Sequence, residues 1–270
     1  MDKKERELHK ETGVAWNVAA AIYERDEEED LTLLRSGGNS LLPPEHRFLH
    51  DLKPWCERAI HLQCAGGTDT LSLWNMGAGE VVGVDISEKM IAVARRKSTV
   101  LSAPARWVCC DVLDTPPELD NTADLVYTGR GALPWIMDIR AWAGVVARIL
   151  KPGGRLYVFE GHPLDWVWDM EATSYQLSSK TGAYFSEAVA TDRGWPLFSV
   201  PIQEHADKDQ FHVHEHQWTL GEIMNSLVAA GMRLERFEEH PDLFWNQFPN
   251  LPAELQDRLP HTFSLLMRKG

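Results

Sequence analysis

The sequence has few cysteines and no long apolar segment, and each absence excludes a class of protein. Four cysteines in 270 residues, with no CxxC pair, are too sparse for a disulfide scaffold. No run approaches the roughly 18 apolar residues that span a bilayer, and the charged residues 1–10 do not resemble a signal peptide. These features predict a soluble, cytoplasmic protein with no membrane partner. We expect reduced, mostly buried thiols at Cys56, Cys64, Cys109 and Cys110.

Positive charge is also scarce. The chain has 27 lysines and arginines against 40 aspartates and glutamates, which gives a formal net charge of -13. Such a protein repels a phosphate backbone, and no Lys/Arg-rich stripe offsets the repulsion, so we expect no nucleic-acid partner. With 44% hydrophobic residues the chain can bury a large core, and its length suits one elaborated domain over residues 1–270. The composition is compatible with a monomer or a homodimer.

Short apolar segments alternate with helical patterns from residue 59 onward. Short strands separated by helices of about ten residues predict right-handed βαβ units and a parallel sheet. The sequence therefore predicts an α/β fold with a Rossmann-like, doubly wound sheet. The expected helices cover residues 69–77, 87–97, 138–150 and 219–231. The seven expected strands cover residues 59–64, 80–86, 106–112, 123–128, 154–160, 232–240 and 261–269.

Two segments fall outside this alternation. Residues 1–55 combine a helical stretch over residues 14–23 with a loop that the Pro43-Pro44 pair interrupts, and they predict an N-terminal helical cap. Residues 161–217 lack the alternation of strand and helix patterns, which predicts an insertion after the fifth strand. Because open α/β sheets bind ligands at the carboxyl ends of their strands, we expect this insertion to cover those ends and to contact the substrate.

A turn of small residues follows the first expected strand. Residues 63–69 read QCAGGTD and lead into a helix, so the backbone can approach a ligand closely and the helix offers unpaired N–H groups. Asp85 ends the second strand about twenty residues later, where a carboxylate can accept hydrogen bonds from both hydroxyls of a ribose. Taken singly, these features are also typical of a tight turn and a helix cap. Their spacing favours a nucleoside-type cofactor.

This region resembles the class I S-adenosylmethionine-dependent methyltransferases, in particular their small-molecule type 11 branch. Residues 59–87 are similar to the family's glycine motif and acidic strand end, residues 110–112 to its adenine-contacting segment, and residues 150–156 to its helix-to-strand turn. Residues 232–240 and 261–269 are similar to its final hairpin, which implies an antiparallel closing strand. The resemblance implies S-adenosylmethionine as the cofactor and a small molecule as the methyl acceptor.

The resemblance also implies a set of cofactor contacts. Asp85 would hold the ribose and Asp111 the adenine amino group. Ile86 and Val112 would enclose the adenine ring. The methionine end would lie along the turn, at Gln63, Cys64, Ala65 and Gly67, and we add Tyr127 at the end of the fourth strand. Two glycines of the family's Gly-x-Gly-x-Gly pattern are replaced here, by glutamine and alanine, and a backbone with positive φ would be strained at both positions.

His61 stands where the family has an acidic residue on its first strand. We interpret it as a core histidine, with a hydrogen bond to the turn as the alternative. Trp16 and Tyr23 belong to an N-terminal helix that closes over the cofactor in related enzymes, with ordinary helix packing as the alternative.

The acceptor site offers no dedicated catalytic motif. Methyl transfer from a sulfonium is an in-line displacement, so positioning is the main requirement, and a base is needed only if the acceptor must lose a proton. Glu160, His162 and His214 are candidate bases, with His162 first, although each could instead stabilise a loop. Arg130 is a candidate to bind an acceptor carboxylate, with a salt bridge as the alternative. The Asn/Asp-Pro-Pro-Tyr/Phe motif of enzymes that methylate the amino nitrogens of nucleobases and glutamine is absent after the fourth strand.

Aromatic and histidine-rich segments supply further candidates. Among the 11 tryptophans, Trp166 and Trp218 could line an acceptor pocket, with core packing as the alternative. Three histidines alternate in residues 211–216, which puts them on one face of an expected strand. We favour a solvated or pocket-lining face over a zinc site there, because neighbours on one strand do not close a tetrahedral site easily. No metal is expected.

Two other functions are compatible with parts of this sequence. An NAD-dependent dehydrogenase shares the first βαβ unit, but the Gly-x-Gly-x-x-Gly fingerprint is absent. A catalytically silent cofactor-binding protein is compatible with the replaced glycines. A binding titration with S-adenosylmethionine and NAD separates the dehydrogenase from the other two, and turnover separates the methyltransferase from the silent protein.

Overall fold

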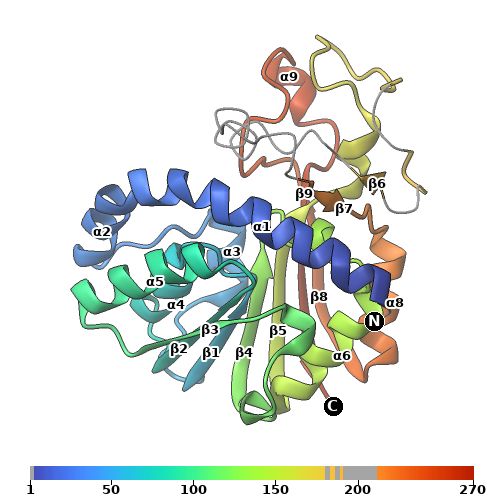
Figure 1. Cartoon of the computed structure of the whole chain (residues 1–270). Coiled ribbons are helices and arrows are strands. Elements are labelled where there is room, and N and C mark those ends of the chain that lie inside the picture. Colours follow the sequence, from blue (N-terminus) through green and yellow to red (C-terminus); the bar gives the residue numbers. More distant parts are fainter. Residues whose placement is uncertain (1–2, 180–182, 186–188, 191–211) are drawn as a thin grey trace.

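A seven-stranded sheet forms the centre of the computed structural model, which describes residues 3–179, 183–185, 189–190 and 212–270 (Figure 1). The strand order is β3-β2-β1-β4-β5-β9-β8. The first five strands are parallel, and β9 runs antiparallel to both of its neighbours, as predicted. The strands are β1 (Arg58–Leu62), β2 (Glu80–Asp85), β3 (Ala105–Cys109), β4 (Ala123–Gly129), β5 (Leu150–Gly161), β8 (Met232–His240) and β9 (Thr262–Lys269).

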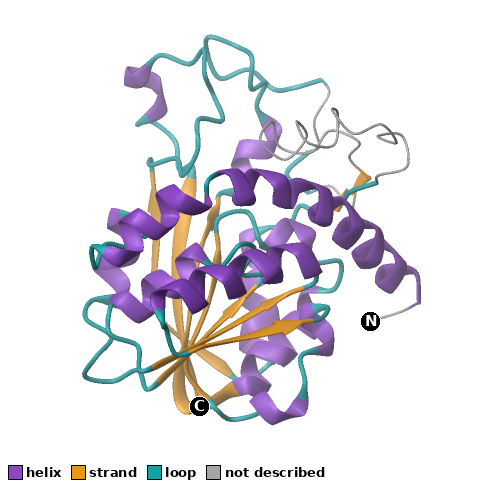
Figure 2. Cartoon of the chain, turned by 60° about the vertical axis from the view of Figure 1, so that its left-hand side comes forward, coloured by secondary structure: helices purple, strands orange, loops and turns teal. Residues whose placement is uncertain are grey.

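Helices cover both faces of this sheet (Figure 2). Because successive strand residues point to opposite faces, β1 sends Ile60 and Leu62 into one core and Ala59 into the other. The first core lies under α6 (Ile139–Ile149) and α8 (Leu220–Ala229), and includes the fully buried Trp142. The second core packs beneath α3 (Pro43–Leu49) and α4 (Thr68–Asn75), with α5 (Glu88–Leu101) alongside.

The N-terminal cap consists of α1 (Lys3–Arg25), α2 (Glu27–Arg35) and α3 (Pro43–Leu49). The helical stretch expected near residue 14 is much longer than predicted, and it passes over the carboxyl ends of the central strands (Figure 1). The interruption expected at Pro43-Pro44 was wrong, because these residues open α3. Proline suits the first turn of a helix, where its fixed φ is already helical and its missing N–H has no partner to lose.

The insertion after β5 is described in part. It contains a 3-10 turn, η4 (Pro163–Val167), and a short two-stranded sheet made by β6 (Val189–Ala190) and β7 (His214–Glu215). Its described residues pack against the long connection between β8 and β9, which carries α9 (Ala253–Gln256). The Tyr175 hydroxyl lies 2.9 Å from His261 Nε2, and Asn250 donates to the Glu171 carbonyl at 3.0 Å. Together these segments stand above the upper end of β5 and β9 (Figure 1).

The remaining connections are short. Three 3-10 turns, η1 (Val112–Asp114), η2 (Pro117–Leu119) and η3 (Leu133–Trp135), lie between β3 and α6. In the part of the chain that the structure describes, no helix is long and apolar enough to cross a membrane.

Candidate functional site

A cavity of about 430 Å³ lies at the carboxyl ends of the central strands, where α1 covers it. Its lining comes from the turn after β1, the ends of β2, β3 and β4, and the cap helices. Nine of the residues predicted to bind cofactor or substrate are in this lining: Gln63, Cys64, Ala65, Gly67, Asp85, Ile86, Asp111, Val112 and Arg130.

The turn after β1 adopts the backbone that the glycine motif predicts, with other residues in two of its positions. Gln63 has φ of 58°, Ala65 has φ of 44° and Gly67 has φ of 79°. Positive φ is unfavourable for residues with a Cβ atom, so Gln63 and Ala65 carry backbone strain. A Cβ atom on Gly67 would lie 2.5 Å from the Trp107 ring, so glycine is required there for packing as well.

Asp85 is fastened to this turn by backbone hydrogen bonds. Its carboxylate accepts from Ala65 N and from Ser87 N, each at 2.8 Å. Burial raises the pKa of Asp85 to about 6, although these backbone N–H groups act against the rise. The carboxylate therefore forms part of the cavity lining as a negatively charged group near neutral pH, with no cation paired to it among the described contacts.

Asp111, just beyond β3, is held by α1. Its Oδ2 lies 2.7 Å from His9 Nδ1, while Oδ1 accepts from Leu113 N at 2.9 Å. His9 Nε2 accepts the Met137 N–H at 2.9 Å, so Nδ1 carries the proton and donates to Asp111. Burial raises the pKa of Asp111, but His9 and Leu113 outweigh it, and the pKa lies below its usual value.

Aromatic side chains of α1 and η3 line the cavity. Trp16 of α1 meets Trp135 edge to face, with ring centroids 5.5 Å apart. Tyr23 packs on Gly66 so closely that a Cβ atom there would lie 2.8 Å from the tyrosine ring. All three rings belong to residues that line the cavity.

His61 is buried, as interpreted from the sequence, and it contacts the helix that follows the turn. Its Nδ1 lies 2.8 Å from Thr70 Oγ1, and its ring packs edge to face on Tyr127 at 4.7 Å. Burial lowers the pKa of His61 to about 4, despite the opposing effect of Asp69. His61 is therefore neutral near pH 7 and supplies no charge to the cavity.

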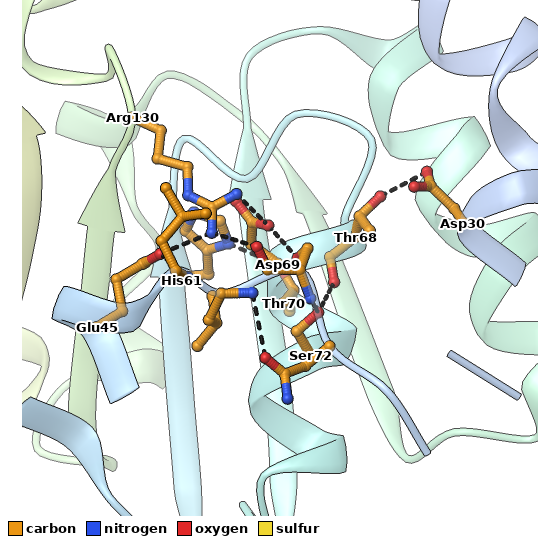
Figure 3. Close-up of polar contacts among 12 residues, drawn as sticks. Asp30, Glu45, His61, Thr68, Asp69, Thr70, Ser72 and Arg130 are labelled. Carbon is orange, nitrogen blue, oxygen red and sulfur yellow. Dashed lines mark hydrogen bonds and ion pairs between the residues drawn. The ribbon is translucent and has the colours of Figure 1, made fainter. Parts of the chain in front are cut away.

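A buried ion-pair network occupies the β4 side of the cavity (Figure 3). Arg130 Nη2 donates to Glu45 Oε2 and to the Ser40 carbonyl, each at 2.7 Å, and Nη1 donates to Asp69 Oδ1 at 3.2 Å. Burial raises the pKa of Asp69, but Arg130 and other neighbours outweigh it, so the pKa lies below its usual value. The salt bridge that the sequence left as an alternative for Arg130 is thus present.

Thr68 extends this network toward α2 and α5. Its hydroxyl donates to Asp30 Oδ2 at 2.7 Å (Figure 3). The fully buried Lys97 donates to the same oxygen at 2.8 Å. The start of α4 is therefore tied to α2 and α5.

Six predicted site residues lie outside the cavity lining. Tyr127 is fully buried in the second core, where its hydroxyl donates to Glu45 Oε1 at 2.5 Å. The Glu160 carboxylate accepts the N–H groups of Gly131, Ala132, Leu133 and Gly161 at 2.6 to 3.0 Å. It holds the loop after β4 in shape.

The histidine and tryptophan candidates are engaged elsewhere. His162 accepts the Leu164 N–H at Nδ1 and lies 3.0 Å from Glu239 at Nε2, so it caps η4. His214 Nε2 lies 2.6 Å from Glu11 of α1. Trp218 donates to the Ile136 carbonyl at 2.8 Å and stacks on His216. Trp166, like these three, is outside the lining of this cavity.

Sequence reasoning named Trp16 and Tyr23 of α1 but missed His9 and Thr12 of the same helix, and the loop before α3. His9, Thr12, Trp16 and Tyr23 all line the cavity and are spaced by three, four and seven residues. That spacing repeats one face of a helix, so it was available as a signal. Ser40 and Glu45 carried no local signal, because their partner Arg130 is more than eighty positions away.

Comparisons with known proteins agree with this geometry. A methyltransferase domain family matches residues 59–154. The ubiquinone/menaquinone biosynthesis C-methyltransferase of Paraburkholderia xenovorans is 30% identical over 177 residues, which cover 63% of this chain and 71% of that protein. The chain belongs to the class I S-adenosylmethionine-dependent methyltransferases. A demethylmenaquinone methyltransferase of Thermus thermophilus is 35% identical over 129 residues, 43% of this chain and 57% of that protein.

Solved structures of methyltransferases share the fold. An S-adenosylmethionine-dependent methyltransferase of Mesorhizobium loti aligns with a TM-score of 0.61 and 23% identity, over 84% of this chain and 96% of that one. The first curated relatives are matched over 31% to 57% of their own length. Membership of this methyltransferase family sets aside the dehydrogenase alternative.

Proposed function

We propose that this methyltransferase transfers the methyl group of S-adenosylmethionine to a small molecule. The observation that carries the proposal is the pair of carboxylates, Asp85 and Asp111, that lie at the carboxyl ends of adjacent strands and line one cavity. A ribose and an adenine amino group are the donors that such a pair would accept, and Ile86 and Val112 line the same cavity as apolar contacts for the ring.

The chain's own residues act by binding and orientation. S-adenosylmethionine supplies the methyl group on a sulfonium that needs no further activation. Glu160, His162 and His214 have their polar atoms engaged outside the cavity, which supports catalysis by positioning rather than by any of these three as a base. Holding the acceptor in line with the methyl carbon is the effect that lowers the barrier.

The acceptor's own contacts come from the aromatic part of the lining. Trp16 and Trp135 present ring surfaces, which suit a small molecule with an apolar or aromatic body. Residues 161–217 remain our proposed cover for the acceptor, supported by the position of their described part above the strand ends.

Calorimetric titration with S-adenosylmethionine, S-adenosylhomocysteine and NAD tests the cofactor. We expect both adenosyl compounds to bind and NAD not to bind. A panel of small acceptors with quinol, carboxylate and amine groups is then screened for release of S-adenosylhomocysteine. Binding without release on any acceptor class would support the catalytically silent protein instead.

A further inference from the structure

Glu160 is a buried carboxylate, 3% exposed, that has no cation among its described contacts. Its Oε1 accepts the N–H groups of Gly131 and Gly161 at 2.6 and 2.8 Å. Its Oε2 accepts those of Ala132 and Leu133 at 2.8 and 3.0 Å. Burial raises the pKa of Glu160, and these N–H groups act against the rise. Backbone dipoles therefore take the place of a counter-ion for this carboxylate.

The loop after β4 is curled around the Glu160 carboxylate. Arg130 and Gly131 have φ of 58° and 90°, and Ala132 returns to the right-handed region with φ of −83°. Left- and right-handed residues in succession turn their N–H groups toward one point, and such a concave backbone binds an anion. Here the chain supplies the anion itself, from the end of β5.

The backbone of β5 continues this contact. Arg130 N donates to the Phe159 carbonyl at 2.7 Å, next to the N–H groups that Glu160 accepts. The N–H groups of residues 130–133 are therefore all bound by two neighbouring residues of one strand. The shape of the loop depends on that strand end.

The same loop forms one wall of the cavity. The Ala132 carbonyl accepts from Gln63 Nε2 at 2.5 Å, which joins the loop to the turn after β1. Trp135, a few residues on, meets Trp16 of α1 edge to face. Glu160 is not itself in the cavity lining, so it acts on the cavity through the loop. The loop residues in the lining are Gly129, Arg130, Gly131, Ala132, Trp135 and Ile136.

Loss of the carboxylate would leave this wall without its support. The N–H groups of residues 131–133 would be buried without an acceptor, which costs more than a change of loop shape that exposes them to water. The left-handed conformation of Arg130 is also unfavourable for a residue with a Cβ atom. When only a fraction of the molecules has the binding shape, the apparent affinity falls by that fraction.

We propose that Glu160 is a positioning residue, whose negative charge shapes residues 130–133 into the cavity wall that S-adenosyl compounds require for binding. The inference rests on the proposed function for the identity of the ligand. It gives Glu160 a role through the backbone of the loop, in place of the proton transfer for which the sequence made it a candidate.

The test is calorimetric titration of the whole chain with S-adenosylhomocysteine. Glu160→Ala is expected to bind it about tenfold or more weakly than the wild type, as when about a tenth of the molecules has the binding shape. Acetate matches the Cγ, Cδ and carboxylate oxygens that this substitution removes. Added acetate should recover about threefold or more of the affinity, compared with chloride at equal ionic strength. Acetamide, which has the same shape and no charge, should not.

Asp124→Ala is the matched control. Asp124 lies near the opposite end of β4, outside the cavity lining, and its carboxylate accepts the N–H groups of Glu57 and Arg58 at 3.0 and 2.9 Å. Its removal should change neither the affinity for S-adenosylhomocysteine nor the response to acetate. The proposal is overturned if Glu160→Ala binds as the wild type does, if acetate does not reverse the loss, or if Asp124→Ala shows an equal loss.

Hydrogen exchange keeps the test decisive if Glu160→Ala does not fold. In the ligand-free wild type, the N–H groups of residues 131–133 should exchange at least about a hundredfold more slowly than in an unstructured peptide. In Glu160→Gln, whose amide group puts a donor among these donors, they should exchange at least about tenfold faster than in the wild type. Unprotected N–H groups in the wild type, or equal exchange in the two proteins, would overturn the proposal.

The two measurements also separate the role of Glu160 from the proposed function. Wild-type protein that does not bind S-adenosylhomocysteine would refute the proposed function. Hydrogen exchange needs no ligand, so it would still decide whether Glu160 holds the loop.

Discussion

The two ends of the cavity are built in different ways. At one end, which we call the adenosine end after its proposed ligand, Asp85 is the last residue of β2 and Asp111 lies two residues beyond β3, and the N–H groups of Ser87 and Leu113 donate to their carboxylates. At the other, which we call the Arg130 end, the guanidinium is held by Ser40 and Glu45, 90 and 85 positions earlier in the chain. The first end depends mainly on strand geometry, with one contact from the cap at His9, and the second depends on docking of the cap.

Because of this difference, substitutions at the two ends have different consequences. A change at the adenosine end removes hydrogen bonds to a few backbone N–H groups. A change at the Arg130 end also leaves a charge buried without its partner, because Glu45 is fully buried and Arg130 is about one-fifth exposed. Breaking such a pair by removing one partner is strongly destabilising.

The largest expected effect is at the adenosine end. Asp85→Ala removes the charged acceptor that we propose for two ribose hydroxyls, and a hydrogen bond to a charged group contributes about 1.5–3 kcal/mol. We expect 5′-methylthioadenosine and S-adenosylhomocysteine to lose affinity equally, by about tenfold to a hundredfold. Calorimetry measures both, with Glu80→Ala at the exposed start of β2 as the control. Unchanged affinities would remove Asp85 from the site.

The second-largest expected effect is that acidification weakens ligand binding at the adenosine end. The pKa of Asp85 is raised to about 6, so its charged acceptor form is lost as the pH falls through that value. Between about pH 8 and about pH 5 the affinity for methylthioadenosine should fall by roughly tenfold. The pKa of Asp111 is lowered, so it adds no such change in this range. Binding measured across this pH range gives the midpoint of the loss of affinity. Asp85→Asn should remove the pH dependence of the affinity. If the midpoint is unchanged in this variant, another group is responsible for the pH dependence.

A smaller effect is expected where the cap reaches the adenosine end. His9→Ala removes the partner of Asp111 and leaves the buried Met137 N–H without its acceptor. Leaving such a group unpaired should lower the free energy of unfolding by about 1–3 kcal/mol. Denaturant unfolding measures this, with the neighbouring exposed Lys10→Ala as the control. Equal stability of the two variants would show that α1 docks without His9.

The smallest effect concerns the strained turn between the two ends. Ala65→Gly relieves a positive φ, and the gain is partly offset by the greater freedom of glycine in the unfolded chain, so we expect a change of roughly 0 to 1 kcal/mol toward stability. Ala147→Gly, in the interior of α6, should instead destabilise by about 1 kcal/mol. Thermal unfolding of both variants provides the measurement. A loss of stability in Ala65→Gly as large as that in Ala147→Gly would contradict the interpretation that Ala65 is strained.

The sequence predicted the adenosine end because its signals are local. A strand, a turn of small residues and an acidic strand end lie within one βαβ unit, so spacing alone places Asp85 in the cavity. The strained φ at Gln63 and Ala65 followed from the same motif, and the structure confirmed it.

The Arg130 end could not be predicted in the same way. Nothing near Glu45 shows that it pairs with Arg130, because that contact exists only after α3 has packed on the sheet. The contacts of Glu160 were hidden for a related reason: its carboxylate accepts backbone N–H groups of a loop about 28 positions away, and sequence does not reveal such partners. Pro43-Pro44 failed because proline marks both an interruption and a first helical turn.

The place of β9 has a consequence for how the chain folds. Strand β9 lies between β5 and β8 in the sheet but follows both in the sequence. During synthesis β5 therefore offers an open edge, and β8 has no partner in the main sheet, until β9 has been made. Open strand edges recruit other chains, and late pairing between distant segments slows folding. We therefore expect the interval before β9 pairs to be the stage at which nascent or refolding chains aggregate most readily.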